Sequence, residues 1–389
     1  MRHISLVILL TFVSSTLLAE IRIAPSDRVK NYISVKEAPE SGTRIVDKLL
    51  KGQSATYLSD ESHYYKVKLD NGSEGFVHKS WSKKLTTTTN TGELEVHFID
   101  VGQGDATLLT CPNGKSILVD AGSLSGYTSD QVREYMLPLL DRKERKIDTL
   151  VITHADRDHY NLIKDTLKNI PVGHTFYVGD HDDYGYGMDD WLIAQSNKTN
   201  LPSTYFDPEN QKNASIDCGA ASVYVLAANI QNNFSHKNTM SIVLMVRYGD
   251  FEVVLTGDAT KKTENKILER YSSAWLDSDV LKIGHHGSKT TSTTEDWASA
   301  IKPQVAVTSS GLRSSYGHPR KEIIQRLEPF TKNDAPSHTI SYASGKRSSY
   351  FWEDIGNYKE QIYSTVNSGN VIIKTNGAGY TVNTVHHRE

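Results

Sequence analysis

The chain has 389 residues, of which 38% are hydrophobic and 23% are charged, and these proportions are typical of a folded globular protein. Its length allows one large domain together with a small one. The formal net charge of −3 excludes an overall positive field that would attract nucleic acid, so any binding of DNA must depend on a local patch.

Residues 1–19 differ in character from the rest of the chain. Arg2 and His3 precede an apolar run that is short for a membrane span, and Ala19 offers a cleavage point. We therefore expect a secretory signal peptide at 1–19 and a secreted or periplasmic protein. An uncleaved anchor is the alternative, because Leu17 is large for its place before the cut. No later stretch approaches spanning length, so we expect no integral membrane part after removal of the signal.

Residues 20–85 alternate short β-like runs with glycine-containing turns, and Asn71-Gly72 is a hairpin signal. The turn KLLKG and the stretch YYKVKLDNGSEGFVHKSW resemble bacterial SH3-like modules, which implies a small all-β barrel. Such modules bind cell-wall peptide, so peptidoglycan is one expected partner, and a simple tether is the alternative. The polar stretch TTTTNTG, residues 86–92, is expected to be a linker.

Residues 93–389 carry strand and helix patterns in alternation, which predicts a layered α/β domain. Cys111 and Cys218 both lie in β-type segments, and an oxidising compartment would permit a bridge between them. Sequence does not decide whether their geometry allows it. With so few thiols, any metal must be held by histidines and carboxylates. The expected elements are the strands LEVHFIDVGQGDATLLT, KSILVDAG and KIDTLVITH, the hairpin SIVLMVRYGDFEVVLTGD, and the helices SDQVREYMLPLLDRKE, KKTENKILERY and RKEIIQRLEPF.

A dense group of potential metal ligands follows the apolar stretch TLVIT. His154, Asp156, Asp158 and His159 lie within positions 154–159. Imidazole and carboxylate are the ligands expected for zinc, manganese or iron. We predict that His154 and Asp156 face one ion and that Asp158 and His159 face a second. A solvated loop with incidental histidines is the alternative, but this clustering at a strand end favours a metal centre.

Two later strand ends and one turn also carry candidate site residues. Asp258 follows an apolar strand, so its carboxylate is predicted to bridge two cations, and an N-cap of the next helix is the alternative. Neighbouring side chains in an extended segment point in opposite directions, so we predict His285 as a ligand and His286 as a residue behind the ligands or facing the substrate. His318, before Pro319, is either an acid on the substrate side or a capping residue.

The order of these motifs resembles the metallo-β-lactamase superfamily, and it is most similar to the hydrolase-like domain of ComEC competence proteins. The resemblance spans about Leu94 to Asn383 and implies an αββα sandwich with one or two divalent ions at the sheet edge. The motifs that carry it are FIDVGQGDATLL, ILVDAG, THADRDH, NTMSIVL, VLTGD, LKIGHHGSK, YGHP and the closing hairpin GNVIIKTNGAGYTV.

The resemblance assigns ligand positions to this sequence. Asp156 replaces the superfamily's usual second histidine, while Asn238 and Ser241 match the ComEC pattern near a position where histidine is usual. His236 lies slightly upstream, so His236 and Asn238 are additional candidates. The first site is then short of nitrogen ligands, which shifts the preference towards manganese or magnesium relative to zinc. The implied ligands are His154, Asp156, Asp158, His159, Asp258 and His285.

We therefore predict a metal-dependent hydrolase that uses one or two Zn or Mn ions. Two cations can lower the pKa of a bridging water and stabilise an oxyanion, so no serine or cysteine nucleophile is needed. Asp158 or Asp258 is expected to hold the hydroxide, and His286 or His318 to protonate the leaving oxygen. Asp105, in the turn 102–105, is expected to orient a ligand, with a tight hairpin as the alternative.

The first hypothesis for the reaction is a phosphodiesterase or nuclease, because the ComEC resemblance implies DNA as a partner. Local positive charge is available at Lys289, Arg313, Arg320 and Lys321. The acidic segment GDHDDYGYGMDDW would repel phosphates and suits a smaller or cationic substrate, such as a choline phosphoester of the cell wall. A non-enzymatic envelope module is the second hypothesis. β-Lactam hydrolysis is a third, which the ComEC-like ligand pattern disfavours.

Overall fold

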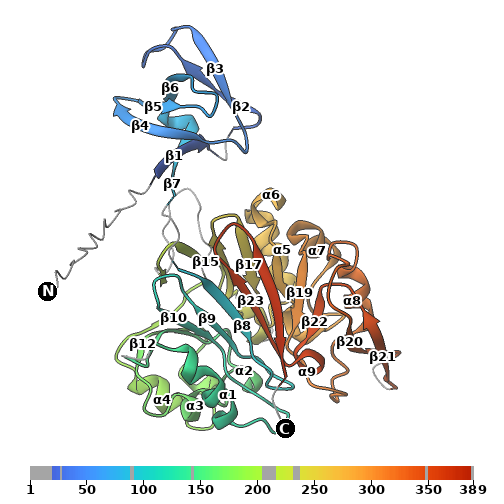
Figure 1. Cartoon of the computed structure of the whole chain (residues 1–389). Helices are drawn as coiled ribbons and strands as arrows, with labels where there is room; N and C mark the ends of the chain where they lie inside the picture. The colour runs from blue at the N-terminus through green and yellow to red at the C-terminus, as the bar shows by residue number, and fades with distance from the viewer. Residues whose placement is uncertain are drawn as a thin grey trace, which may run out of the picture. The chain divides into compact units, whose positions relative to one another are not determined.

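The computed structural model describes residues 20–26, 29–87, 92–141, 144–203, 216–230, 237–346 and 349–386. The chain forms two compact units, Met1–Thr91 and Gly92–Glu389 (Figure 1). The predicted signal peptide at 1–19 and the candidate ligand His236 lie outside the described residues. Within the described ranges, no helix is both long enough and apolar enough to traverse a bilayer.

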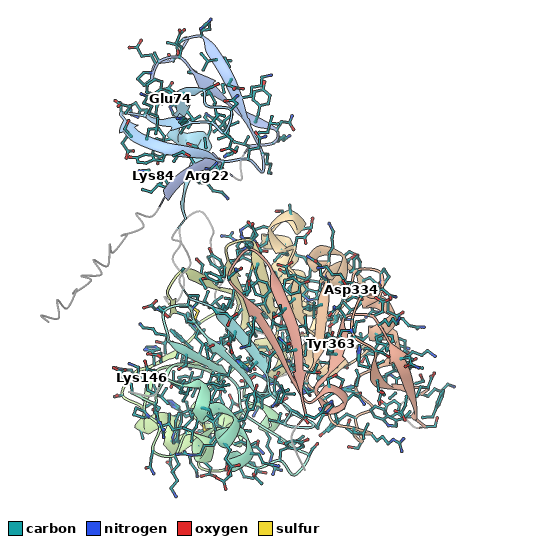
Figure 2. The ribbon with its side chains drawn as sticks, viewed as in Figure 1. Arg22, Glu74, Lys84, Lys146, Asp334 and Tyr363 are labelled. Carbon is teal, nitrogen blue, oxygen red and sulfur yellow. A yellow bond between two sulfur atoms is a disulfide. The ribbon has the colours of Figure 1, made fainter. Side chains whose placement is uncertain are left out.

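The N-terminal unit is an antiparallel sheet with the strand order β3-β2-β6-β5-β4-β1-β7. The predicted hairpin is confirmed: Gly72 has a φ of 86°, and its N–H donates to the carbonyl of Leu69 between β5 and β6. Arg22 and Lys84 lie on the paired strands β1 and β7 (Figure 2). The bounds are β1 Glu20–Pro25, β2 Tyr32–Lys36, β3 Ile45–Leu50, β4 Ala55–Glu61, β5 Tyr64–Lys68, β6 Glu74–His78 and β7 Ser82–Thr87.

The end of this sheet differs from the predicted domain boundary. Strand β7 pairs with β1 as far as Thr87, so Thr86 and Thr87 belong to the sheet and not to a linker that starts at residue 86. The β-branched threonines that made this stretch look unpatterned are well suited to an edge strand. Residues 88–91 of the predicted linker lie outside the described residues.

The larger unit contains two sheets, and each combines antiparallel and parallel pairs. One sheet has β8 Leu94–Phe98, β9 Thr107–Thr110, β10 Ser116–Val119, β11 Ile147–Val151, β12 Val172–Tyr177, β13 Lys198–Asn200, β23 Asn370–Thr375 and β24 Tyr380–Val385. The other has β14 Asp217–Cys218, β15 Ala221–Ala227, β16 Val243–Tyr248, β17 Phe251–Leu255, β18 Val280–Lys282, β19 Val305–Thr308 and β22 Ile362–Ser364. Strands β20 His338–Ser344 and β21 Phe351–Tyr358 form a separate hairpin.

Helices cover the outer face of both sheets (Figure 1). On the first sheet, Leu118 and Leu150 pack with Val132 and Ile163 of the covering helices. On the second, Val254 packs in one cluster with side chains of α5, α7 and α8. The helices are α1 Ser129–Met136, α2 Arg157–Tyr160, α3 Ile163–Thr166, α4 Met188–Ala194, α5 Lys261–Arg270, α6 Ser273–Leu276, α7 Glu295–Ile301, α8 Lys321–Leu327 and α9 Thr365–Ser368.

The inner faces of the two sheets share one apolar core. Phe98 and Val151 of the first sheet pack in the same buried cluster as Leu244 and Val305 of the second. Strands buried on both faces account for the near-continuous apolar runs in the sequence. The predicted αββα sandwich is therefore confirmed.

A disulfide joins the two sheets of the larger unit. Cys111 follows β9, Cys218 ends β14, and the Cα atoms of the bridged pair are 5.0 Å apart. Both side chains are buried. The pairing that the sequence left open is therefore present in the structure.

Candidate metal centre

The imidazoles of His154 and His159 are held by one hydrogen-bond network at the ends of β10 and β11. His159 Nδ1 lies 2.7 Å from Asp120 Oδ2, and a carboxylate only accepts, so Nδ1 carries the proton and donates it. The hydroxyl of Thr153 donates to the same oxygen at 2.6 Å, so it accepts from His154 Nδ1 at 3.0 Å. Both rings therefore present Nε2 to the same space, where it can carry a proton or bind a cation.

His286 is oriented in the same way from the second sheet. Its Nδ1 donates to the carbonyl oxygen of Ser309, 2.7 Å away, so Nε2 is the ring nitrogen that faces the cluster. The residue lies in the turn Gly284–Gly287 after β18. The carboxyl ends of parallel strands share one edge of a sheet, and this edge faces the end of β11.

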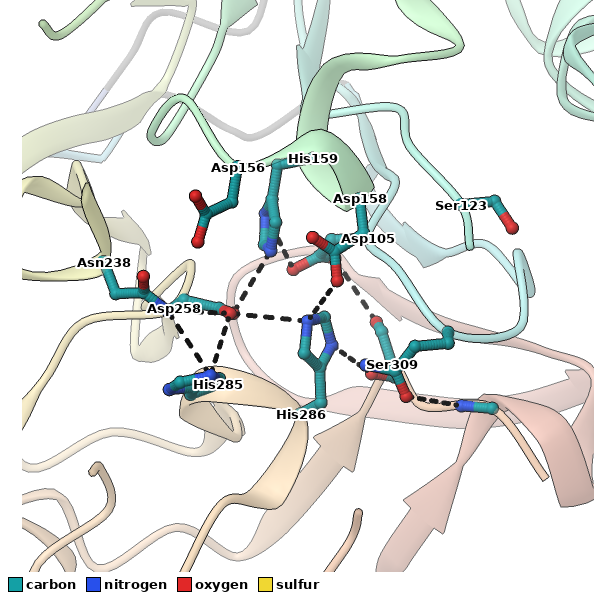
Figure 3. Close-up of polar contacts among 12 residues, drawn as sticks. Asp105, Ser123, Asp156, Asp158, His159, Asn238, Asp258, His285, His286 and Ser309 are labelled. Atoms are coloured by element: carbon teal, nitrogen blue, oxygen red, sulfur yellow. Dashed lines mark hydrogen bonds and ion pairs between the residues drawn. The ribbon is translucent and has the colours of Figure 1, made fainter. Parts of the chain in front are cut away.

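The Nε2 atoms of His159 and His286 face the carboxylates of Asp258 and Asp158 (Figure 3). His159 Nε2 is 3.3 Å from Asp258 Oδ1, and His286 Nε2 is 3.4 Å from Asp258 Oδ2 and 3.3 Å from Asp158 Oδ2. The ligand atoms of His154, His159 and Asp258 all lie within 4.8 Å of one another, as do those of Asp158, His159 and His286.

The converging atoms are buried and lack hydrogen-bond partners. In the described part of the chain, this holds for Nε2 of His154, His159 and His286 and for Oδ1 of Asp258. Buried polar atoms are almost always satisfied, so a group of unpartnered nitrogen and oxygen atoms aimed at one space calls for an ion. Imidazole nitrogen and carboxylate oxygen fit a divalent cation such as zinc or manganese.

The electrostatics of the cluster also call for positive charge. Burial opposes protonation of His286, but the carboxylates of Asp258 and Asp158 outweigh it and raise its pKa to about 10. Burial would raise the pKa of Asp258, but the imidazoles of His286, His159 and His285 hold that pKa well below its usual range. The buried carboxylates thus need compensating charge, which a divalent cation can supply in place of protons.

The backbone at His285 and His286 differs from the extended segment that the predicted roles assumed. Both residues are left-handed, with φ of 48° and 53°, so the alternation of side chains along a strand does not apply to them. His285 Nδ1 lies 2.8 Å from Thr291 Oγ1, and its Nε2 is 3.3 Å from the amide nitrogen of Asn238. His285 therefore lies beside the cluster, 3.7 Å from Asp258, whereas His286 lies within it.

The remaining predicted residues lie around this cluster. Asp156 Oδ2 is 3.6 Å from His154 Nε2, and the Asp156 side chain is 39% exposed. The N-cap alternative for Asp258 is wrong, because α5 takes Thr260 as its N-cap. His318 packs against His285 with ring centroids 5.7 Å apart. Burial, with the nearby His286 and His285, lowers the pKa of His318 to about 3, so its imidazole is neutral.

Sequence analysis missed two buried residues of the site, Asp120 and Lys282. Asp120, and not Asp105, bonds to His159, because Asp105 Oδ2 is 4.0 Å from the same nitrogen. Asp105 instead pairs with the buried ammonium of Lys282 and accepts from Ser309 Oγ at 3.3 Å. The segment ILVDAG signalled Asp120 by placing a carboxylate at a strand end.

Two family models match the chain: "Bacterial SH3 domain" over residues 31–83 and "Metallo-beta-lactamase superfamily" over residues 99–211. ComE operon protein 3 of Bacillus subtilis is 28% identical over 255 residues, which cover 61% of this chain and 31% of that protein. Recombination protein 2 of Haemophilus influenzae is 31% identical over 236 residues, which cover 61% of this chain and 26% of that protein.

Among solved structures, a metallo-β-lactamase from Hirschia baltica is similar with a TM-score of 0.31 and 15% identity, covering 49% of this chain and 85% of that one. The chain spans less than a third of the length of the two curated relatives. It therefore consists of a bacterial SH3 domain followed by a metallo-β-lactamase domain that is homologous to part of ComE operon protein 3 and of Recombination protein 2.

Proposed function

We propose that the chain is a metal-dependent phosphodiesterase that acts on nucleic acid outside the cytoplasm. The observation that carries this proposal is the set of buried, unpartnered Nε2 atoms of His154, His159 and His286 facing the carboxylates of Asp258 and Asp158. Such a donor set favours a hydrolase that activates water over one that uses a side-chain nucleophile.

A divalent ion bound there would supply Lewis-acid charge, which makes water acidic near neutral pH and stabilises a phosphoryl oxyanion. The chain's own groups then have distinct tasks. Asp158 is 15% exposed, and the imidazoles of His286 and His159 overcome the effect of burial and lower its pKa. It is therefore ionised at neutral pH and placed to accept a proton from the attacking water.

Other groups position these side chains or meet the substrate. Asp120 and the carbonyl of Ser309 fix the rings of His159 and His286, so both nitrogens stay aimed at the centre. His318 is neutral, and its buried Nδ1 has no hydrogen-bond partner among the described residues. It is available to hydrogen-bond to the substrate or to the leaving oxygen.

The substrate class and the location of the protein are part of the proposal. The name of Recombination protein 2 refers to recombination, which favours DNA as the polymer. The Cys111–Cys218 disulfide favours an oxidising compartment and agrees with the expected signal peptide. In the SH3 domain, Tyr32, Ile45 and Leu50 are exposed and offer apolar contacts for cell-wall peptide.

The test is turnover of bis(4-nitrophenyl) phosphate and of a labelled DNA strand by the full chain loaded with Mn²⁺ or Zn²⁺. We expect turnover by the wild-type chain and at least about 100-fold loss in His159→Ala, because a ligand is removed and not only an orienting group. The control is His174→Ala, whose ring on β12 lies 2.9 Å from Thr199 Oγ1 and outside the cluster. Tight metal binding without turnover of either substrate would contradict the proposal and favour a binding module.

A further inference from the structure

The basic residues that the sequence offered for DNA binding are neutralised by acidic partners. Lys289 Nζ is 2.6 Å from a Glu322 oxygen, and Lys321 Nζ is 3.1 Å from a Glu353 oxygen. Arg313 pairs with Asp354 at 3.3 Å, and Arg320 pairs with Glu322 at 3.4 Å. A phosphate would have to displace these carboxylates, so this side of the site is a poor place for a nucleic-acid backbone.

A cavity of about 300 Å³ lies instead beside α2, the helix that carries part of the metal cluster. Its charged lining consists of Arg157, Lys164 and Asp165, so the two cations and one anion give a net charge of +1. Tyr160, Asn161, Tyr186 and Met188 complete the lining. Tyr186 and Met188 belong to the acidic segment GDHDDYGYGMDDW, but none of the aspartates of that segment lines the cavity.

The two cations of this cavity have no acidic partner among the described residues. The guanidinium of Arg157 makes no hydrogen bond or ion pair with the described residues, and it lies 4.5 Å from the centroid of the Tyr186 ring. The ammonium of Lys164 makes only a long contact, 3.4 Å, to the carbonyl oxygen of Tyr186. Both side chains are exposed, so their charge is available to a ligand.

The cavity is formed before any ligand arrives. Tyr186 and Gly187 are both left-handed, with φ of 60° and 70°, and this turn holds the Tyr186 ring against Arg157. The N–H of Gly185 donates to the hydroxyl of Tyr160 at 2.9 Å, which ties the turn to the end of α2. A stacked guanidinium has few rotamers left, so it loses little entropy when it binds an anion.

Arg157 also connects the cavity to the metal cluster along the chain. Its neighbours Asp156 and Asp158 point to His154 and His286, at 3.6 and 3.3 Å, while Arg157 points to the solvent. Each of these carboxylates is therefore the immediate chain neighbour of a residue that lines the cavity. A polymer bound at the cluster would reach this cavity with its adjoining backbone.

The chemistry of the cavity discriminates between the two substrate classes raised by the sequence. A choline group is itself a cation, so the guanidinium of Arg157, which lies over one face of the Tyr186 ring, and the nearby ammonium of Lys164 would repel it. A phosphate is instead attracted by Arg157 and Lys164, and the planar guanidinium matches its oxygens with two parallel hydrogen bonds. The exposed part of Tyr186, which is 64% exposed, remains available to a base.

We propose that this cavity binds a backbone phosphate of single-stranded nucleic acid next to the phosphodiester held at the metal cluster. The inference rests on the proposed function and deepens it, because it selects a polymer with several phosphates over a small phosphoester. Arg157 and Lys164 bind the phosphate, and Tyr186 holds the guanidinium in place.

The test measures binding without turnover. Fluorescence anisotropy of a labelled oligothymidylate is followed with the full chain in EDTA over a range of KCl concentrations. We expect Arg157→Ala and Lys164→Ala each to raise Kd about 10-fold, as the loss of a charged hydrogen bond does. Each should also make the slope of log K against log[salt] shallower by about 0.7.

The matched control is Lys168→Ala. Lys168 is exposed, lies just beyond α3, and does not line the cavity, so its loss removes the same charge and should leave Kd unchanged. The inference is overturned if wild-type chain fails to bind the strand at low salt, or if Lys168→Ala weakens binding as much as Arg157→Ala. It is also overturned if tripolyphosphate binds as tightly as the oligonucleotide, because the cavity would then recognise phosphate alone.

The measurement of oligonucleotide binding distinguishes a failure of this inference from a failure of the proposed function. Turnover of bis(4-nitrophenyl) phosphate without Arg157-dependent binding of the strand would overturn the inference only. Arg157-dependent binding without any turnover by the metal-loaded chain would contradict the phosphodiesterase and leave the nucleic-acid site in place.

Discussion

The two units of the chain treat their charged side chains in opposite ways. In the SH3 domain, Asp60 is exposed and satisfied: it pairs with Lys84 and Lys79 at 2.8 and 2.9 Å and accepts from Tyr57 at 2.6 Å. In the metallo-β-lactamase domain, Asp258 is 2% exposed, and its Oδ1 has no hydrogen-bond partner among the described residues.

The difference distinguishes structural charges from functional ones. Exposed pairs contribute little to stability, and their removal is tolerated. A buried carboxylate that faces orphaned imidazoles is costly to keep without a cation, so the fold around it must be selected for something other than stability. Substitutions in the two units should therefore differ both in size and in the property that they change.

The largest effect is expected for His286→Ala. An apparent binding free energy of roughly 10–16 kcal/mol shared by about four ligands predicts a loss of about 100- to 1000-fold in metal affinity when one ligand is removed. The measurements are bound metal by mass spectrometry and turnover of bis(4-nitrophenyl) phosphate. His285→Ala, at the neighbouring position, should lose less than about 10-fold, as expected for a residue outside the ligands. A larger loss in His285→Ala would reverse the assignment made from the left-handed turn.

A change in stability of about 3 kcal/mol is expected from the titration of Glu264. Burial raises its pKa to about 7, although hydrogen bonds from Thr294 and Thr293 oppose the shift. The folded pKa lies above the unfolded value of 4.5, so this contribution is fully present below pH 4.5 and is lost as the pH rises through 7.

Glu264→Gln removes this titration. The free energy of unfolding of the wild type, relative to the variant, should fall by about 3 kcal/mol between pH 4 and pH 8. Urea unfolding of both chains at several pH values measures the difference. A difference that stays constant with pH would show that the buried carboxyl has an ordinary pKa.

A smaller loss, about 10- to 100-fold in metal affinity, is expected for Asp120→Asn. The asparagine can turn its NH₂ group towards His159 Nδ1, which would move the ring proton to Nε2 and block the lone pair. Competition with a coloured chelator measures the affinity. Asp130→Asn on α1 is the control, because Asp130 is exposed and the same charge is removed. Equal affinity in the two variants would mean that Asp120 does not set the tautomer of His159.

The sequence identified the site residues that lie close together in the chain or directly after an apolar strand. His154, Asp158 and His159 lie in one motif, and the apolar strand before them predicts that they emerge together at a sheet edge. Asp258 follows the same logic on β17. A layered α/β domain followed from the length and periodicity of the apolar runs, and the αββα sandwich followed from the resemblance to the metallo-β-lactamase superfamily.

The sequence did not reveal the features that depend on unusual backbone angles or on side chains that are far apart in the chain. His286 lies in the cluster and His285 beside it because both residues have left-handed backbone angles. The alternation of side chains along a strand does not apply to such angles. The bond between Asp120 and His159 spans 39 residues, so nothing local pairs them. The apparent basic patch fails for the same reason, because the carboxylate that neutralises Arg313 is supplied by Asp354, from another element.

The smallest effect is expected for Lys84→Ala in the SH3 domain. Lys84 lies 4.2 Å from the Tyr57 ring centroid and pairs with Asp60, but Lys79 remains beside that carboxylate after the substitution. We expect the melting temperature to fall by only a small amount, and this decrease should be smaller at high salt. Metal content and turnover should be unchanged. Differential scanning calorimetry and the chelator assay test this. If Lys84→Ala reduced metal binding as Asp120→Asn is expected to, the division between satisfied surface charges and unsatisfied buried ones would fail, because a fully paired exposed residue would then control the buried cluster.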